Sequence, residues 1–402
     1  MKFLSVLIKP ASSLCNLRCR YCFYEDVSRQ REQMSYGVMT KGVMKHLIDR
    51  IFEAVDEDGT VVFAFQGGEP TLAGLSYYRE FVVYVDSKKK NRTICYVLQT
   101  NGTLLDDEWG VFFGKINFLV GVSLDGYESN TNEFRIDSEG SGIYRNIMNG
   151  IDVLRRYGVE FNILAVITQK LSKHAKAFYS FLKNQGFSYV QCIPCLGELH
   201  CKTEYQLRPD GYAKFYKTLY DLWLEDYRKG EYRSISLFDN ILLMLTDRVP
   251  NQCGMLGSCN MQFVVEADGS VYPCDFYVLD EYCCGNVVEH SVEEIGNSDG
   301  WKRFWEKKIR QKEVAKTVRS GKYAEVGVNA NRGVICGKMG VPIENFWSMH
   351  IRHCRLLHEK YKKTGFARFL YFFLKSPFCH SFDRGSIFGR SHICNFLNCL
   401  EK

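Results

Sequence analysis

Short apolar runs alternate with amphipathic stretches over the first 240 or so residues of the chain. The apolar runs predict buried strands at 3–8, 61–65, 94–99, 117–123, 160–167 and 188–193. Between them, apolar residues recur at helical spacing and predict helices at 40–55, 76–90, 104–113, 143–157 and 173–185. Strands and helices that alternate in this way build a parallel sheet of the α/β class. Right-handed βα units then curve into an open (β/α)6 barrel, a partial TIM barrel.

Local signals support the predicted helices. Asp106 precedes apolar residues at helical spacing and predicts a helix start, whereas Gly158 and Gly186 predict helix ends. A further helix at 211–228 carries aromatic and leucine side chains on one stripe, which favours core packing over a cofactor site. In such a barrel, ligand chemistry gathers at the C-terminal ends of the strands.

Three cysteines follow the first predicted strand. Cys15, Cys19 and Cys22 are separated by three and then two residues, so one short loop can wrap three thiolates around a compact centre. Soft thiolates select iron–sulfur clusters or zinc. A structural zinc site would be closed by a fourth Cys or His, and none follows within the loop. Three ligands therefore favour a [4Fe–4S] cluster with one open iron over zinc or three unrelated buried cysteines.

With Tyr21 before its last cysteine, this motif resembles the signature of radical S-adenosylmethionine (SAM) enzymes. The flanking segments 8–13 (IKPASS), 22–24 (CFY) and 63–71 (FAFQGGEPT) are similar to the anaerobic sulfatase-maturating enzymes. These form a peptide-modifying branch that carries a cysteine-rich SPASM domain. The resemblance runs nearly continuously to about Lys312. It implies a [4Fe–4S] cluster bound with SAM, auxiliary [4Fe–4S] clusters and an anaerobic cell.

The resemblance also implies roles for single residues. For SAM it implies contacts from Tyr21, Gly68, Ser123, Arg135 and Leu196. For the peptide substrate it implies contacts from Tyr24, Gln66 and Gln99. Asp275 matches the catalytic base of the family. Arg135 would pair with the SAM carboxylate in a charge-assisted bond, although a lone loop Arg is more often solvated.

Taken without the resemblance, these positions have simpler interpretations. Gly67 and Gly68 follow a strand and let a ligand approach the backbone, and Glu69 suits an ammonium group. A Gly-Gly pair alone more often marks only a turn. Residues 100–102 (TNG) are as typical of a tight turn as of a strand end that contacts a ligand. Without the resemblance, the favoured interpretation of Asp275 is an Asp at the end of a strand that bonds a backbone amide of a turn.

A second group of cysteines begins near residue 251. Strands at 263–266 and 271–277 flank Asp268-Gly269, a hairpin signal that brings the end of the second strand back toward the start of the segment. Three cysteines can then converge and, by resemblance, begin the SPASM domain with its auxiliary cluster: Cys253, Cys259 and Cys274. Cys192 and Cys195 form an isolated C-x-x-C that favours buried, idle thiols.

The resemblance implies an enzyme that oxidises a Cys or Ser side chain of a sulfatase to Cα-formylglycine. In that chemistry a 5′-deoxyadenosyl radical takes a hydrogen from the substrate Cβ, and Asp275 removes the thiol or hydroxyl proton. The implied partners are the sulfatase polypeptide and a reductant such as flavodoxin or ferredoxin. Three alternatives stay open: another SPASM-type peptide-modifying enzyme, a non-catalytic iron–sulfur electron carrier, and an inactive frameshifted product.

Composition places the protein in a reducing compartment. The chain has 402 residues and 17 cysteines, and it shows no signal peptide or apolar run long enough to cross a membrane, so we expect a cytoplasmic protein without a membrane partner. Its net charge of +6 is unevenly placed. Residues 314–402 hold 15 Lys and Arg against 5 Asp and Glu, whereas residues 1–313 hold 37 against 41. The basic character therefore belongs to the tail and indicates no nucleic-acid partner.

The resemblance stops where the family continues with Cys-x2-Cys-x5-Cys-x3-Cys. Residues 314–328 contain no cysteine, yet they can be encoded so that reading from the third base gives C-E-N-C-P-E-W-K-I-C-R-G-G-C. In the same frame, 343–357 can encode a segment similar to the family's closing helix, and 361–362 permit a stop codon. We therefore predict an out-of-frame tail without an evolved fold. The three predicted parts are a radical SAM barrel at 1–240, the beginning of an incomplete SPASM domain at 241–313 and a poorly ordered tail at 314–402.

Overall fold

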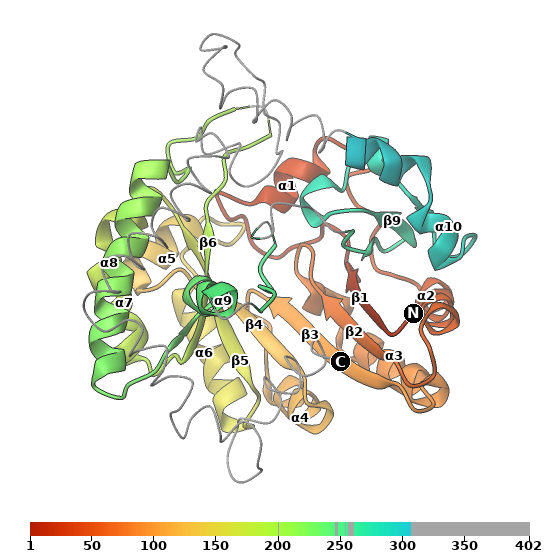
Figure 1. Cartoon of the computed structure of the whole chain (residues 1–402), viewed down its shortest axis with the longest axis horizontal. Coiled ribbons are helices and arrows are strands. Elements are labelled where there is room, and N and C mark those ends of the chain that lie inside the picture. Colours follow the sequence, from red (N-terminus) through yellow and green to blue (C-terminus); the bar gives the residue numbers. More distant parts are fainter. Residues whose placement is uncertain (200, 246–247, 254, 256–260, 307–402) are drawn as a thin grey trace. The chain divides into compact units, whose positions relative to one another are not determined.

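The computed structural model describes residues 1–199, 201–245, 248–253, 255 and 261–306. These residues belong to one compact unit that runs from Met1 to Arg310. The predicted parallel strands are all present and pair in chain order. They are β1 (Phe3–Ile8), β2 (Thr60–Phe65), β3 (Thr93–Thr100), β4 (Leu119–Ser123), β5 (Phe161–Ile167) and β6 (Tyr189–Pro194). The prediction of an α/β fold built on a curved parallel sheet is confirmed (Figure 1).

The helices lie around the outside of this sheet, as the amphipathic pattern predicts (Figure 1). They are α2 (Lys41–Ala54), α3 (Leu75–Lys88), α4 (Asp107–Ile116), α6 (Tyr144–Arg156), α7 (Ala175–Asn184) and α8 (Pro209–Arg228). A further helix, α9 (Ser236–Leu245), was not predicted and appears near the centre of the view in Figure 1. The core between sheet and helices is rich in aromatic rings. Phe63 and Phe65 of β2 each meet Phe81 of α3 edge to face, with ring centroids 5.0 Å apart.

The predicted helix ends are confirmed. The Asp106 side chain accepts a hydrogen bond from the Trp109 backbone N–H and caps α4. Gly158 and Gly186 adopt positive φ values of 63° and 67° just beyond α6 and α7. Several short elements were not predicted: α1 (Phe23–Ser28), α5 (Glu128–Phe134), α10 (Val292–Gly296), and the 3-10 turns η1 (Pro70–Ala73), η2 (Leu171–His174), η3 (Asp275–Tyr277) and η4 (Asp280–Tyr282).

The cysteine-rich segment extends the barrel sheet beyond β1. Strand β8 (Val264–Val265) pairs parallel to β1, and β9 (Ser270–Tyr272) and β10 (Gly285–Asn286) follow it antiparallel. At the other edge, β7 (Ser234–Ile235) pairs with β6. The described residues thus form a 10-stranded sheet that continues across the predicted boundary at residue 240. The β8–β9 hairpin pairs with β1, so backbone N–H and C=O groups of β1 that would be unpaired at the edge of the sheet have partners.

The predicted hairpin turn is present, but its second strand is shorter than expected. Gly269 has a φ of +92°, the left-handed region that favours glycine. The strand expected at 271–277 ends at Tyr272, and the chain enters η3 at Asp275. This early end turns Asp275 out of the ladder and toward the barrel, where the site described below lies.

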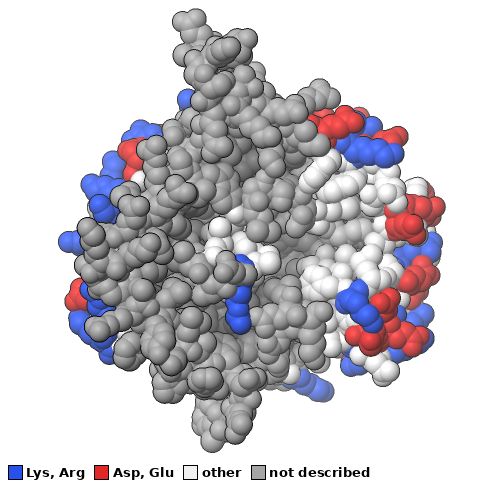
Figure 2. Space-filling model, viewed as in Figure 1, with Lys and Arg blue, Asp and Glu red and all other residues white. Residues whose placement is uncertain are grey.

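No helix within the described ranges is long and apolar enough to cross a membrane. At the margins of the face in Figure 2, the described Lys and Arg side chains lie among Asp and Glu. Residues 314–402, predicted to be out of frame and poorly ordered, lie outside the described residues, as does Cys259.

Candidate active site

The first cysteine loop lies directly after β1. Its turns are held by backbone bonds, among them Cys22 N–H to the Cys19 carbonyl at 3.1 Å, and the Leu17 N–H lies 3.4 Å from Cys15 Sγ. Burial raises the pKa of Cys15 to about 11 and that of Cys19 to about 12. The charge of Cys22 adds to the rise in pKa at both sites, so the three sulfurs lie close enough to interact.

The donor set of this loop, three thiolates, has the chemistry of an iron–sulfur site. No three His, Cys, Asp or Glu side chains in the described part of the chain converge as ligands of a single metal ion would. The thiolates of a cubane each bind a different iron, so they need not meet at one point. A bound cluster would also displace the thiol protons that burial otherwise favours.

The glycine pair after β2 lies against the cysteine loop. The backbone N–H of Gly68 donates to the Ser12 carbonyl at 3.0 Å, and that of Glu69 donates to the Leu14 carbonyl at 2.7 Å. A Cβ atom at Gly68 would stand 2.1 Å from the Leu14 oxygen, and Gly67 has a φ of +129°. Glycine is therefore required here by the approach of another backbone segment, whether or not a ligand also approaches.

Glu69 does not present its carboxylate as expected for an ammonium site. Its side chain is buried and accepts hydrogen bonds from Thr71 N–H (3.1 Å), Thr71 Oγ1 (2.6 Å), Thr100 Oγ1 (2.7 Å) and Asn101 N–H (2.7 Å). Burial raises its pKa, and the hydrogen bonds from Asn101 and Thr71 oppose that rise. Glu69 instead ties the end of β2 to the end of β3 beneath the cysteine loop.

Arg135 and Tyr21 meet at a buried carboxylate that sequence reasoning gave no role. Asp125 is fully buried after β4 and pairs with Arg135 through Nε at 3.0 Å and a second guanidinium nitrogen at 3.2 Å. It also accepts hydrogen bonds from the Tyr21 hydroxyl and from the Val166 N–H. Asp125 therefore contacts two predicted SAM residues, Tyr21 and Arg135. A third predicted SAM residue, Ser123, lies two positions before it in the sequence. The sequence signal for Asp125 is its position in 123–126 (SLDG), directly after the predicted strand at 117–123.

This pairing predicts a large stability loss for Asp125→Asn, because the variant leaves the Arg135 charge buried without its counter-ion. Breaking a buried ion pair from one side typically costs about 3–5 kcal/mol. The matched control is Glu80→Gln, which breaks the exposed pair with Lys41 (2.6 Å) and should cost about 1 kcal/mol or less. Denaturant unfolding of both variants measures the difference, and equal midpoints would contradict the prediction.

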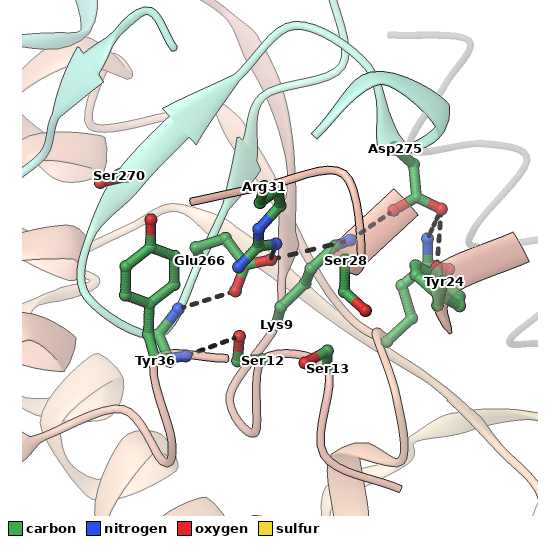
Figure 3. A network of polar contacts seen from close by, with 12 residues as sticks. Lys9, Ser12, Ser13, Tyr24, Ser28, Arg31, Tyr36, Glu266, Ser270 and Asp275 are labelled. Carbon is green, nitrogen blue, oxygen red and sulfur yellow. Dashed lines mark hydrogen bonds and ion pairs between the residues drawn. The ribbon is translucent and has the colours of Figure 1, made fainter. Parts of the chain in front are cut away.

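A second group of predicted residues converges on Asp275. Its Oδ2 accepts hydrogen bonds from the Tyr24 hydroxyl at 2.6 Å and from Gln66 Nε2 at 3.0 Å. Its Oδ1 lies 3.1 Å from Lys9 Nζ. The Asp275 carboxylate is buried, and Figure 3 shows it pointing toward Tyr24 and Lys9. Residues far apart in the sequence thus meet at one carboxylate, and one of them, Tyr24, lies two residues beyond the cysteine loop.

Sequence reasoning missed Lys9, Glu266 and Arg31, three buried charged residues beside Asp275. The sequence signal for two of them was weak: Lys9 directly follows the predicted strand 3–8, and Glu266 is the last residue of the predicted strand 263–266. Charged side chains are almost never fully buried unless they are paired. Pairing across the sheet could not be inferred before β8 was known to lie beside β1.

The remaining predicted residues take separate positions. Ser123, Gln99 and Leu196 are partly buried, the first two at the ends of their strands. Of the second cysteine group, Cys274 is partly buried and Cys253 exposed. Cys192 and Cys195 are buried, and burial raises the pKa of both thiols, to about 12 for Cys192. That environment suits the idle thiols expected for this C-x-x-C.

The sequence matches the Radical SAM superfamily over residues 10–181 and an iron–sulfur cluster-binding domain (SPASM) over residues 253–317. It is 45% identical over 308 residues to a cysteine-type anaerobic sulfatase-maturating enzyme of Clostridium novyi, covering 76% of this chain and 82% of that protein. The chain belongs to the anaerobic sulfatase-maturating enzymes.

More distant and structural relatives agree with the family. A serine-type anaerobic sulfatase-maturating enzyme of Bacteroides thetaiotaomicron is 30% identical over 320 residues, covering 75% of this chain and 77% of that protein. A solved structure described as native anSMEcpe with bound AdoMet and Cp18Cys peptide superposes with a TM-score of 0.72 at 40% identity. It covers 76% of this chain and 82% of that one. The fold predicted for this sulfatase-maturating enzyme is therefore confirmed.

Proposed function

We propose that this enzyme oxidises a cysteine side chain of a sulfatase polypeptide to Cα-formylglycine with SAM and [4Fe–4S] clusters. The observation that carries the proposal is the convergence of Tyr24 and Gln66 on the Asp275 carboxylate, next to the cysteine loop. A cysteine substrate is favoured over serine because identity is 45% to a cysteine-type relative and 30% to a serine-type relative.

Cys15, Cys19 and Cys22 would hold the first cluster, with SAM contacted by Tyr21, Gly68, Ser123, Arg135 and Leu196. Bound there, the cluster and SAM supply one-electron chemistry that removes a hydrogen atom from the substrate Cβ. Cys253, Cys259 and Cys274 would hold an auxiliary cluster, and a flavodoxin or ferredoxin would serve as reductant. The chain's own task is to position the peptide, and Gln99 joins Tyr24 and Gln66 in that role.

Asp275 acts in this proposal as the base that takes the substrate thiol proton. Two donors, Tyr24 and Gln66, already bond its Oδ2. A thiol that approaches Oδ2 therefore competes with two donors of the proposed peptide-binding set, whereas Oδ1 accepts no hydrogen bond from the described residues.

The test is anaerobic reconstitution with iron and sulfide, followed by mass spectrometry of two sulfatase-motif peptides that differ only in Cys or Ser at the target position. An aldehyde on the Cys peptide, formed faster than on the Ser peptide, supports the proposal. A thioether or crosslinked product would instead identify another SPASM-type peptide-modifying enzyme. SAM binding without any peptide change would favour an iron–sulfur electron carrier or an inactive product.

A further prediction concerns residues 314–402, which we propose are read out of frame. The iron–sulfur domain match ends at residue 317. Reading the gene across codons 305–365 should show that the third-base frame encodes C-E-N-C-P-E-W-K-I-C-R-G-G-C from residue 314. A frame-restored chain should bind more iron after reconstitution than the chain as it stands, because it regains four thiolates. Codons incompatible with those cysteines would contradict the prediction.

A further inference from the structure

Four buried side chains of alternating charge form a row between the barrel and the hairpin (Figure 3). Arg31 lies 2.7 Å from Glu266 Oε1, Lys9 Nζ lies 4.0 Å from the same oxygen, and Lys9 Nζ lies 3.1 Å from Asp275 Oδ1. Residue exposure is 7% for Arg31, 1% for Glu266, 2% for Lys9 and 6% for Asp275. Charges buried this deeply are stable only when each has a partner.

The sheet fixes the centre of this row. Strands β1 and β8 pair in parallel with Ile8 opposite Val265, and the Lys9 N–H donates to the Val265 carbonyl at 2.8 Å. Lys9 directly follows β1 and Glu266 directly follows β8, so the two residues lie at the same level of the sheet. A backbone ladder places them, so their side chains start from fixed points rather than from mobile loops.

Lys9 is the member of the row that touches the proposed base. Its ammonium forms an ion pair with Oδ1 of Asp275 at 3.1 Å, an oxygen that accepts no hydrogen bond within the described part of the chain, while Oδ2 accepts hydrogen bonds from Tyr24 and Gln66. Lys9 Nζ also lies 4.4 Å from the centre of the Tyr24 ring, within cation–π range. One cation thus lies against both the carboxylate and the ring of a donor that bonds it.

We propose that Lys9 is a positioning residue for Asp275, which it orients by holding Oδ1 so that Oδ2 is presented to the peptide side. The inference rests on the proposed function, because it assumes that Asp275 acts on the substrate. Glu266 anchors Lys9 from the other side, and Arg31 balances Glu266. The competing interpretation is that Lys9 only fastens the hairpin to β1.

The experiment compares Lys9→Met with Lys9→Arg and with Arg31→Met in the full-length reconstituted enzyme. The measured quantity is peptide product formed per 5′-deoxyadenosine released. Misplacing a reacting group by about 1 Å can cost about 100-fold, so Lys9→Met should lower this ratio at least about 10-fold while SAM cleavage persists. Lys9→Arg restores a cation and should recover most of the ratio.

Arg31→Met is the matched control, because it removes a buried cation of the same row that does not pair with Asp275. It should destabilise the fold as Lys9→Met does, yet lower the ratio less. An equal fall in both variants, or an unchanged ratio in Lys9→Met, would overturn the proposal. If Lys9→Met does not fold, Lys9→Gln, which removes the charge but keeps a hydrogen-bond donor and leaves the Arg31–Glu266 pair intact, takes its place.

A crystal structure of the same Lys9 variant separates this inference from the proposed function. Loss of at least one of the two Oδ2 contacts, to Tyr24 or to Gln66, is the expected result. If the carboxylate keeps both contacts, Lys9 does not orient it and the inference is wrong. This outcome does not depend on which product the enzyme makes, so a different peptide modification would overturn the proposed function alone.

Discussion

Replacing Cys15, Cys19 and Cys22 together with Ala is expected to abolish the formation of 5′-deoxyadenosine from SAM. The three thiols are the only Cys, His, Asp or Glu side chains between residues 9 and 24, so the loop would retain no soft ligand for iron. Without a cluster in this loop there is no local electron source for SAM cleavage. The expected effect is therefore complete loss rather than a reduced rate.

The matched control removes three other cysteines, Cys192, Cys195 and Cys201, from the same barrel. Two of them are buried and one is exposed, and none belongs to either proposed cluster. Both triple variants are reconstituted without oxygen and assayed for bound iron and for 5′-deoxyadenosine. The control should cleave SAM as the unaltered chain does. Cleavage at the unaltered rate in the loop variant would remove these cysteines from the cofactor site.

The parallel sheet was predictable because its signals are local. Each of the six strands contains a short apolar run with buried residues, and the helices carry one apolar stripe. β1 has the predicted bounds, and β3 extends the predicted 94–99 by one residue at each end. Capping followed the same logic, since Asp106 and Gly158 act on their own helix ends. Such features need no knowledge of distant segments.

Short elements and long-range pairings were not predictable in this way. Helix α1 has six residues and β8 has two, too few for a periodic pattern. The pairing of β8 with β1 joins segments more than 250 residues apart. It decides where Asp275 lies, and the sequence carries no signal for it beyond the hairpin turn.

Charged site residues show the same limit. Glu69 was expected to face a ligand, but it bonds Thr100 and Asn101 at the next strand end. Arg135 was expected to face the SAM carboxylate, and in the structure it pairs with Asp125. The roles of these residues toward a ligand stay predictions. Their partners depend on which strand ends lie side by side, and a charged residue's role follows from its partner.

Asp275→Asn is expected to separate peptide oxidation from SAM cleavage. Asn keeps the shape of the side chain and can still accept from Tyr24 or Gln66, but it cannot take a thiol proton. Removal of a general base typically costs about 10²–10⁴-fold in rate. SAM cleavage should persist, because Cys15, Cys19 and Cys22 are unchanged. The measurement is formylglycine and 5′-deoxyadenosine from the same anaerobic reaction.

Asp226→Asn provides a close structural control for this variant. Asp226 is also buried, accepts a hydrogen bond from the Tyr179 hydroxyl at 2.9 Å and pairs with Lys183 at 2.9 Å. It therefore loses the same kinds of contact, between α7 and α8 instead of at the proposed base. Both variants should lose stability, whereas only Asp275→Asn should lose product per SAM cleaved. If Asp275→Asn forms formylglycine at a near-normal rate, Asp275 is not the base. Its role would then be structural, like that of Asp226.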